Sequence, residues 1–534
     1  MRFRNSSNYF GLAADARRAD NAKVGYWQGF WQLTSSIYNL ATVIHAAGST
    51  SSAANGALAI CSNVTSTSTV RRGSLRNCCP MIIGLWYKRA MPELVSIPSR
   101  IQGRNLVRAI GRWSLVALVV NSIIGSGIFG LPSTVADIIG KYSPYAVLGA
   151  GAGMGVIMGC FAEVASRFQE AGGPYLYARV AFGRFMGIQT AWMLWLGQVA
   201  APAANANLFV IYLGQFWPQA KDPIPRALIL TALVGFLAFI NIRGVRAGAQ
   251  VSNLFTAAKL VPLFVVIFLG LLVLHNQHWQ IATASTATPA SLDQWMKAML
   301  LLVFAYGGFE TALAPMSEAK NPRRDAPFAL FTALLACTVI YALIQWVVVG
   351  VLPNTMHSPR PLAEVARIAI GPLGAALVAV GALISFYGYL SAKILAMPRV
   401  LFAQAEQGDF PKPFAALHRR FHTPYLSILV FAALVWGFAL IGEFKWNVTL
   451  SAVARLLYYA VSCAALPVLR RRQPEGAMFK LPAGNFSAAL GVILCIILVT
   501  RVDFGQSLIV IATIALALLN WVMVRNRTGV GAAS

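Results

Sequence analysis

The chain has 534 residues, of which 57% are hydrophobic and 11% are charged. Soluble domains carry about 25% charged residues, so this chain has too few charges to cover a water-facing surface of its size. Its formal net charge of +26 comes from short basic segments between apolar runs, a pattern typical of membrane proteins and not of nucleic-acid-binding proteins. We therefore expect membrane lipid as the solvent and no nucleic-acid partner.

Residues 1–105 differ in composition from the rest of the chain. They are rich in Ser, Asn, Thr and Ala and contain no clean apolar run of about 20 residues, the length that crosses a bilayer. We expect this segment to be an N-terminal extension that is disordered or not part of the functional chain, which would then start near Met91.

About twelve apolar runs long enough to span a bilayer follow this segment. Their approximate limits are 113–136, 143–167, 184–214, 225–242, 250–274, 294–315, 328–352, 371–403, 424–442, 447–469, 484–500 and 505–524. The predicted fold class is an all-α polytopic membrane protein. Basic residues concentrate in alternate short loops and at both ends of this region, which places both termini in the cytoplasm of a multi-pass protein.

The first predicted span is interrupted. Gly125, Gly127 and Gly130 precede Pro132 within it, and each glycine costs a helix about 1 kcal/mol relative to alanine while proline costs about 3 kcal/mol. Such a break is tolerated in a membrane when it is buried in protein or lines a cavity. A half-helix that begins after the break would direct its N–H groups into that cavity and suit a carboxylate. The alternative is close helix packing through small residues.

The sixth predicted span repeats the interruption at Gly307 and Gly308, next to Glu310. An ionisable group at that depth is functional by default. Broken segments five spans apart indicate an inverted repeat with the binding site between its halves, which is the architecture of alternating access. We place repeat 1 at about 113–274, repeat 2 at about 294–469 and two extra helices at about 484–524.

Lys259 lies within the fifth predicted span. It is either a lysine whose ammonium reaches the interface or a buried cation that stands where a coupling ion would otherwise bind. Lys259 and Glu310 are therefore the candidate coupling residues. The spans contain no nucleophile–base pair and no set of metal ligands, so we expect no enzyme, no metal and no cofactor.

Four motifs in order resemble the amino acid–polyamine–organocation superfamily, specifically the bacterial amino acid permeases. They are IIGSGIFGLP at 123–132, AGGPYLY at 171–177, FAYGGFE at 304–310 and EAKNPRR at 318–324. The resemblance implies that residues 106–527 form a transporter domain with two inverted five-helix repeats, two additional helices, and breaks in helices 1 and 6.

The resemblance also implies the site. The substrate-binding residues would be Ile124, Gly125, Ser126, Gly127, Phe304, Ala305, Tyr306, Gly307 and Gly308. In such permeases the first break and the Ser126 hydroxyl hold the substrate carboxylate, carbonyls of the second break accept its ammonium group, and Phe304 is a gate. Lys259 matches a lysine of sodium-independent members, which favours proton coupling or exchange.

The expected function is secondary transport of amino acids across the cytoplasmic (inner) membrane. Neutral amino acids are favoured because the pocket around Tyr306 and Gly308 looks apolar. Two alternatives stay open: an antiporter for cationic amino acids or polyamines in which Glu310 meets the substrate charge, and an amino acid sensor that transports nothing. Expected partners are a small-molecule amino acid, protons and membrane lipid; the sequence does not indicate an oligomeric state.

Overall fold

The computed structural model describes residues 111–168, 172–244, 249–276, 290–313, 321–352, 358–474 and 476–525. Within these ranges, every regular element is an α-helix or a 3₁₀-helix. The prediction for residues 1–105 lies outside the described residues, as does Glu318. The described chain is thus the region in which the spans were predicted.

The α-helices follow one another closely along this region. They are α4 (Arg112–Ile123), α5 (Ser126–Ile139), α6 (Ser143–Ala165), α7 (Gly173–Phe182), α8 (Arg184–Leu213), α9 (Pro223–Arg243), α10 (Ala249–Asn276), α11 (Leu292–Tyr306), α12 (Phe309–Ala312), α13 (Pro322–Val351), α14 (Pro361–Ile370), α15 (Pro372–Glu406), α16 (Tyr425–Ile441), α17 (Phe444–Arg472), α18 (Gly484–Val499) and α19 (Phe504–Val524). Each predicted span overlaps one of these helices or one broken pair. The all-α class is confirmed, whereas the short helices α7 and α14 were not predicted.

Length and hydropathy identify membrane-crossing helices among the described residues. Seven helical segments are long and apolar enough to cross a bilayer: Ser126–Ala165, Arg184–Leu213, Pro223–Arg243, Arg324–Val351, Pro372–Glu406, Phe444–Arg472 and Phe504–Val524. Shorter apolar helices lie at Arg112–Ile123, Lys259–His275, Tyr425–Ile441 and Gly484–Val499. The chain is a multi-pass membrane protein.

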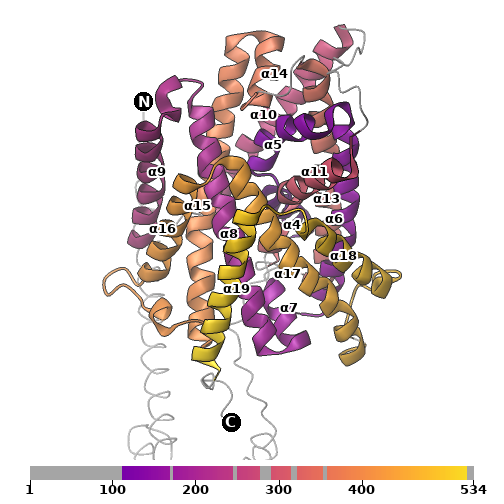
Figure 1. Ribbon diagram of the computed structural model, residues 1–534, viewed down its shortest axis with the longest axis vertical. Coiled ribbons are helices and arrows are strands. Elements are labelled where there is room, and N and C mark those ends of the chain that lie inside the picture. Colours follow the sequence, from indigo (N-terminus) through magenta and orange to yellow (C-terminus); the bar gives the residue numbers. More distant parts are fainter. Residues whose placement is uncertain are drawn as a thin grey trace, which may run out of the picture. The chain divides into compact units, whose positions relative to one another are not determined.

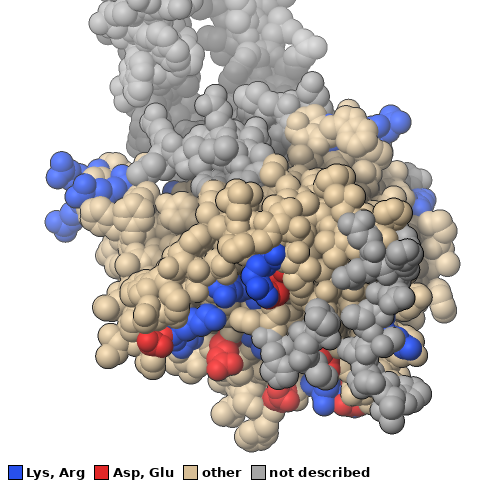
Figure 2. Space-filling view, turned by 90° about the horizontal axis from the view of Figure 1, so that it is seen from above, with Lys and Arg blue, Asp and Glu red and all other residues tan. Residues whose placement is uncertain are grey.

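Large apolar side chains are exposed on the outer helices. Phe236 on α9, Phe268 on α10 and Ile511 on α19 have exposed fractions of 55%, 64% and 61%. A soluble monomer rarely exposes so much apolar surface, but lipid acyl chains cover it without cost. Figure 2, which looks onto one end of the bundle, shows groups of Lys and Arg beside Asp and Glu among other residues. The exposed surface therefore matches the composition.

The helices of the first half of the chain pack against those of the second half in reciprocal pairs. The third helix of each half packs against the fifth helix of the other, as α8 does with α17 and α15 with α10. Equivalent helices also pack on each other, namely α6 on α13 and α9 on α16; α9 and α16 lie side by side at one edge in Figure 1. A two-fold relation between the halves produces this pattern and supports the predicted inverted repeat.

The two helices that were not predicted, α7 and α14, add evidence for the internal repeat. Both α7 and α14 are 10 residues long, and they lie at opposite ends of the bundle (Figure 1). Each follows the second helix of its half and ends in a similar sequence, ARVAFG at 178–183 and ARIAIG at 366–371. The final glycines, Gly183 and Gly371, have φ of 92° and 73°, values that glycine adopts far more readily than other residues. Opposite placement of two similar units is what inversion of the repeat requires.

Candidate functional site

The first break separates α4 from α5. Ile124 and Gly125 are extended, with φ, ψ of −70°, 103° and −133°, −149°, and α5 restarts at Ser126. No described side chain caps the start of α5. Its first-turn N–H groups therefore lack helical partners and carry the positive end of the helix dipole.

The second break separates α11 from α12. Gly307 is extended, whereas Gly308 has φ of +112°, a conformation that strongly favours glycine. A Cβ atom on Gly308 would also overlap the carbonyl oxygen of Ser122 in α4. A Cβ atom on Gly127 would lie 2.8 Å from the Cα atom of Ala305. The glycines thus allow the two broken helices to touch backbone to backbone.

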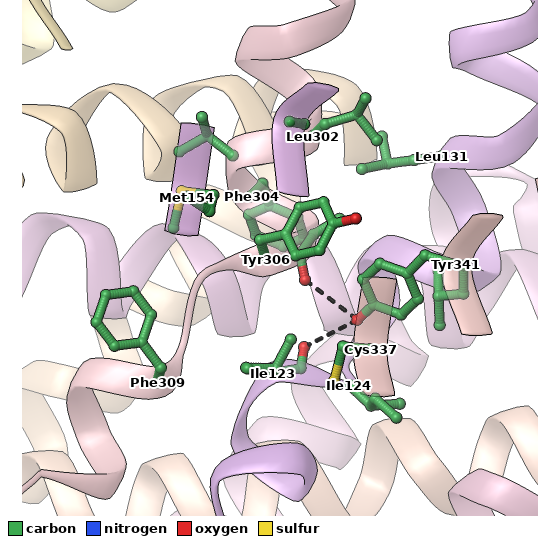
Figure 3. Packing of buried hydrophobic residues seen from close by; sticks show 14 of the residues in the cluster. Ile123, Ile124, Leu131, Met154, Leu302, Phe304, Tyr306, Phe309, Cys337 and Tyr341 are labelled. Carbon is green, nitrogen blue, oxygen red and sulfur yellow. Dashed lines mark hydrogen bonds between the residues drawn. The ribbon is translucent and has the colours of Figure 1, made fainter. Parts of the chain in front are cut away.

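Side chains from neighbouring helices bind carbonyls that the breaks release. The Tyr341 hydroxyl lies 3.3 Å from the Ile123 oxygen and 3.2 Å from the Ala305 oxygen, and its single proton is shared between these two acceptors. This contact ties one break to the other through α13 (Figure 3). The Lys259 ammonium donates to the carbonyls of Asn121 and Ile124, both at 3.2 Å. These contacts answer the requirement that backbone groups inside a membrane find partners within the protein.

A cavity lies between the breaks, and the space in and around it that protein atoms do not fill, open solvent included, is about 220 Å³. It is narrow, with little room beyond that for a single water molecule. Its lining residues come from six helices (α4, α5, α8, α11, α15 and α17) and both breaks: Ser122, Ile123, Gly125, Ser126, Gly127, Asn205, Phe304, Gly307, Tyr389 and Arg455. The structure thus brings both halves of the predicted site to one cavity.

Five of the predicted binding residues line this cavity. They are Gly125, Ser126, Gly127, Phe304 and Gly307. The other four are chain neighbours of lining residues but do not themselves line the cavity in the described structure: Ile124, Ala305, Tyr306 and Gly308. The Tyr306 side chain points away, since its hydroxyl donates to the Val147 oxygen of α6 at 2.9 Å. If these four residues contribute to binding, they do so through their backbone groups or by shaping the breaks.

Several polar atoms around the cavity lack hydrogen bonds. The Ser126 hydroxyl, the Asn205 carbonyl oxygen, and the Nε and Nη1 atoms of Arg455 are buried and have no partner among the described residues. An unsatisfied buried polar group costs about 1–3 kcal/mol. These polar atoms come from three different helices and belong to residues that line one cavity. A polar ligand bound there would supply their missing hydrogen bonds.

Glu310 is buried beside the cavity and is surrounded by donors. Its Oε1 atom accepts from Tyr458 at 2.8 Å and from Gln198 at 3.1 Å. Its Oε2 atom accepts from Tyr459 at 2.9 Å and from the Gly308 N–H at 2.9 Å. The carboxylate therefore fixes the second break and joins it to α8 and α17, and it is not among the described residues that line the cavity.

Five lining residues escaped the sequence analysis. Ser122 and Ile123 lie at the end of α4, directly before the first break; the other three are Asn205, Tyr389 and Arg455. These three lie on the continuous helices α8, α15 and α17, where no interruption marks a site. Arg455 does carry a signal, because an arginine in the middle of an apolar span is costly and usually functional. Lys393 on α15 is a further buried cation of this kind, 7% exposed.

Comparisons with known proteins agree with this geometry. The family described as "Amino acid permease" matches residues 110–526. The methylthioribose transporter of Bacillus subtilis (strain 168) is 26% identical over 409 residues, which cover 73% of this chain and 87% of that protein. The serine/threonine exchanger SteT of the same organism is 28% identical over 405 residues, 73% of this chain and 90% of that protein. The chain belongs to the amino acid permease family, and both of these relatives are transport proteins.

Proposed function

We propose that this protein carries amino acids across the cytoplasmic membrane by alternating access and binds them between its two helix breaks. One observation carries the proposal: the start of α5 and the end of α11 meet at one cavity. The substrate carboxylate would bind the free N–H groups of α5 and the Ser126 hydroxyl. The substrate ammonium would bind carbonyl oxygens at the end of α11, which carries the negative end of its helix dipole.

The carbonyls at the second break retain capacity for such a ligand. The Phe304 oxygen accepts the Gly307 N–H at 3.2 Å, and the Ala305 oxygen accepts the Tyr341 hydroxyl. A carbonyl oxygen has two lone pairs, so each can accept a second hydrogen bond. Phe304 itself lines the cavity, which suits the proposed role of its ring as a gate.

Charge in the core opposes cationic substrates. Lys259, Lys393 and Arg455 are all buried near the cavity, and Glu310, which pairs with Arg455, is the carboxylate described beside it. A substrate with a positive side chain would add to this excess. We therefore propose substrates without a cationic side chain, with neutral amino acids as the starting class, and set aside the polyamine antiporter.

Lys259 supports coupling without sodium. Its ammonium binds the carbonyls of Asn121 in α4 and of Ile124 in the first break, so a basic side chain occupies the position from which these oxygens could otherwise hold a metal ion. We propose that Lys259 takes part in proton coupling or exchange, and that Glu310 acts through its ion pair with Arg455, whose Nη1 atom lies 3.7 Å from Oε1. The distribution of basic residues places both termini and the α7 end in the cytoplasm.

Purified protein in proteoliposomes tests this function. Labelled serine should enter faster when unlabelled serine is inside, if the protein exchanges substrates, or when an inward proton gradient is imposed, if it couples to protons. Arginine and putrescine should not compete. Stabilisation of the purified protein by amino acids without any flux would show a sensor and overturn the proposal.

A further inference from the structure

Arg455 on α17 is a cavity residue with unused hydrogen-bonding capacity. Its exposed fraction is 1%, and it lines the cavity between the breaks. Its Nε and Nη1 atoms have no hydrogen-bond partner among the described residues. The separation of 3.7 Å between Nη1 and Glu310 Oε1 is longer than a hydrogen bond, which spans 2.7–3.2 Å in proteins.

The guanidinium group stands at the second break. Its central carbon lies 5.6 Å from the centre of the Phe304 ring, the ring proposed as a gate. A Cβ atom on Gly307 would overlap the guanidinium, so glycine at that position makes room for the arginine. The cation therefore borders the same space that a bound substrate would enter.

The surrounding charges do not balance. Tyr389 lines the cavity, and its ring centre lies 5.9 Å from the Lys259 ammonium and 5.3 Å from the Lys393 ammonium. Lys393 donates to the Gln198 side-chain oxygen at 2.7 Å, and Lys259 donates to backbone carbonyls, so the acceptors of both lysines in these hydrogen bonds are neutral. Three basic side chains, Lys259, Lys393 and Arg455, thus lie around this part of the cavity, and Glu310, which pairs with Arg455, is the carboxylate described beside it.

We propose that Arg455 receives a carboxylate on the substrate side chain, so that dicarboxylic amino acids of the aspartate and glutamate type are preferred substrates. The inference rests on the proposed function and moves its substrate class from neutral to acidic. A guanidinium presents N–H donors in a planar fork that matches a carboxylate. Such a ligand would supply partners for Nε and Nη1 and offset the excess positive charge.

Other side chains fit this environment less well. An aliphatic side chain would leave the arginine N–H groups buried without partners, and a cationic one would be repelled. A hydroxyl or an amide could accept one hydrogen bond but would leave the charge excess in place. The discrimination should therefore be largest between isosteric pairs that differ in charge, such as aspartate and asparagine.

Competition in proteoliposomes compares these pairs directly. We expect aspartate or glutamate to inhibit labelled serine uptake at a concentration about tenfold or more below that of asparagine or glutamine, since a charge-assisted hydrogen bond is worth about 1.5–3 kcal/mol and 1.4 kcal/mol is tenfold. The same order should appear in ligand-dependent thermal stabilisation of the purified wild-type protein, a measurement that needs no variant to fold.

Substitution assigns the preference to Arg455. Arg455→Gln should remove the advantage of aspartate over asparagine, and Arg455→Lys should retain part of it. Arg501→Gln is the matched control, because Arg501 lies in the turn between α18 and α19 and pairs with Asp293 outside the cavity; it should leave the ratio unchanged. Each variant is compared after its folded fraction is measured.

Several outcomes would overturn the inference while the proposed function stands. One is serine uptake with no preference for acidic over amide competitors. Another is an unchanged ratio in folded Arg455→Gln. A third is serine uptake that requires chloride while aspartate fails to compete, which would make an inorganic anion the partner of Arg455. Absence of uptake for every amino acid, by contrast, would count against the proposed function itself.

Discussion

Glycines at the breaks act through the space that they leave. Gly127 and Gly308 each lie where a Cβ atom would press on the backbone of the other broken helix. Their role is therefore steric, and it differs from that of Gly235 on α9, around which a Cβ atom would meet nothing within 4 Å. This contrast lets the site be tested one residue at a time.

Gly127→Val should abolish uptake, because the added side chain would force α5 and α11 apart at the cavity. Gly235→Val introduces the same side chain at an open position and should transport normally. Uptake by both variants is measured after the amount of folded protein is matched by size-exclusion chromatography. Normal uptake by Gly127→Val would refute the assignment of this break to the site.

Lys259→Ala should remove or alter the pH dependence of transport, because it deletes the titratable group that binds the carbonyls of Asn121 and Ile124. Lys297→Ala is the control, since Lys297 is a half-exposed lysine on α11 that pairs with Asp293 at 2.8 Å. Initial uptake rates between pH 5 and 9 provide the profile. A profile identical to that of the wild type would argue against a coupling role for Lys259.

At the scale of elements, the long helices were predictable and the short ones were not. An apolar run of about 20 residues has few alternatives in a membrane, so spans such as α8 and α9 could be located to within a few residues. The short helices α7 and α14 have only 10 residues each and mix apolar with charged side chains. Their related ends, ARVAFG and ARIAIG, were the available signal for a repeat.

The site was predictable only where the chain itself is irregular. Gly125 and Gly307 interrupt helices, and this interruption is visible in the sequence. Asn205 and Arg455 reach the cavity from continuous helices, and their approach depends on how α8 and α17 pack. The apolar pocket inferred from the residues around Tyr306 overlooked this packing, because the Tyr306 side chain points to α6 and the arginine enters from α17.

Tyr341→Phe should weaken the connection between the broken helices. The substitution removes the hydroxyl whose one proton is shared between the carbonyls of Ile123 and Ala305, and a hydrogen bond contributes about 0.5–1.5 kcal/mol to stability. We expect a lower unfolding temperature and slower uptake. Tyr145→Phe, at an exposed position on α6, controls for the loss of a hydroxyl. Thermal stability and uptake equal to the wild type would mean that Tyr341 does not hold the breaks together.

At the scale of the whole molecule, the two halves have equivalent helices that pack in reciprocal pairs, and both halves line one cavity. The third and fifth helices of the halves pack in reciprocal pairs, and α7 and α14 cap opposite ends (Figure 1). Such a molecule can open toward either side by the same relative movement of its halves, while the breaks continue to hold the ligand. The proposed alternating access would use this relation between the halves.

The central claim is that the two breaks recognise the α-carboxylate and the α-ammonium of one substrate. The most direct measurement is inhibition of labelled serine exchange in proteoliposomes by matched analogues. Serine itself should compete, whereas ethanolamine, which lacks the carboxylate, and glycerate, which lacks the ammonium, should each compete at least about tenfold more weakly, as expected when one charge-assisted contact is lost. Equal competition by either analogue, or strong competition by methylthioribose, which has neither group, would contradict the claim.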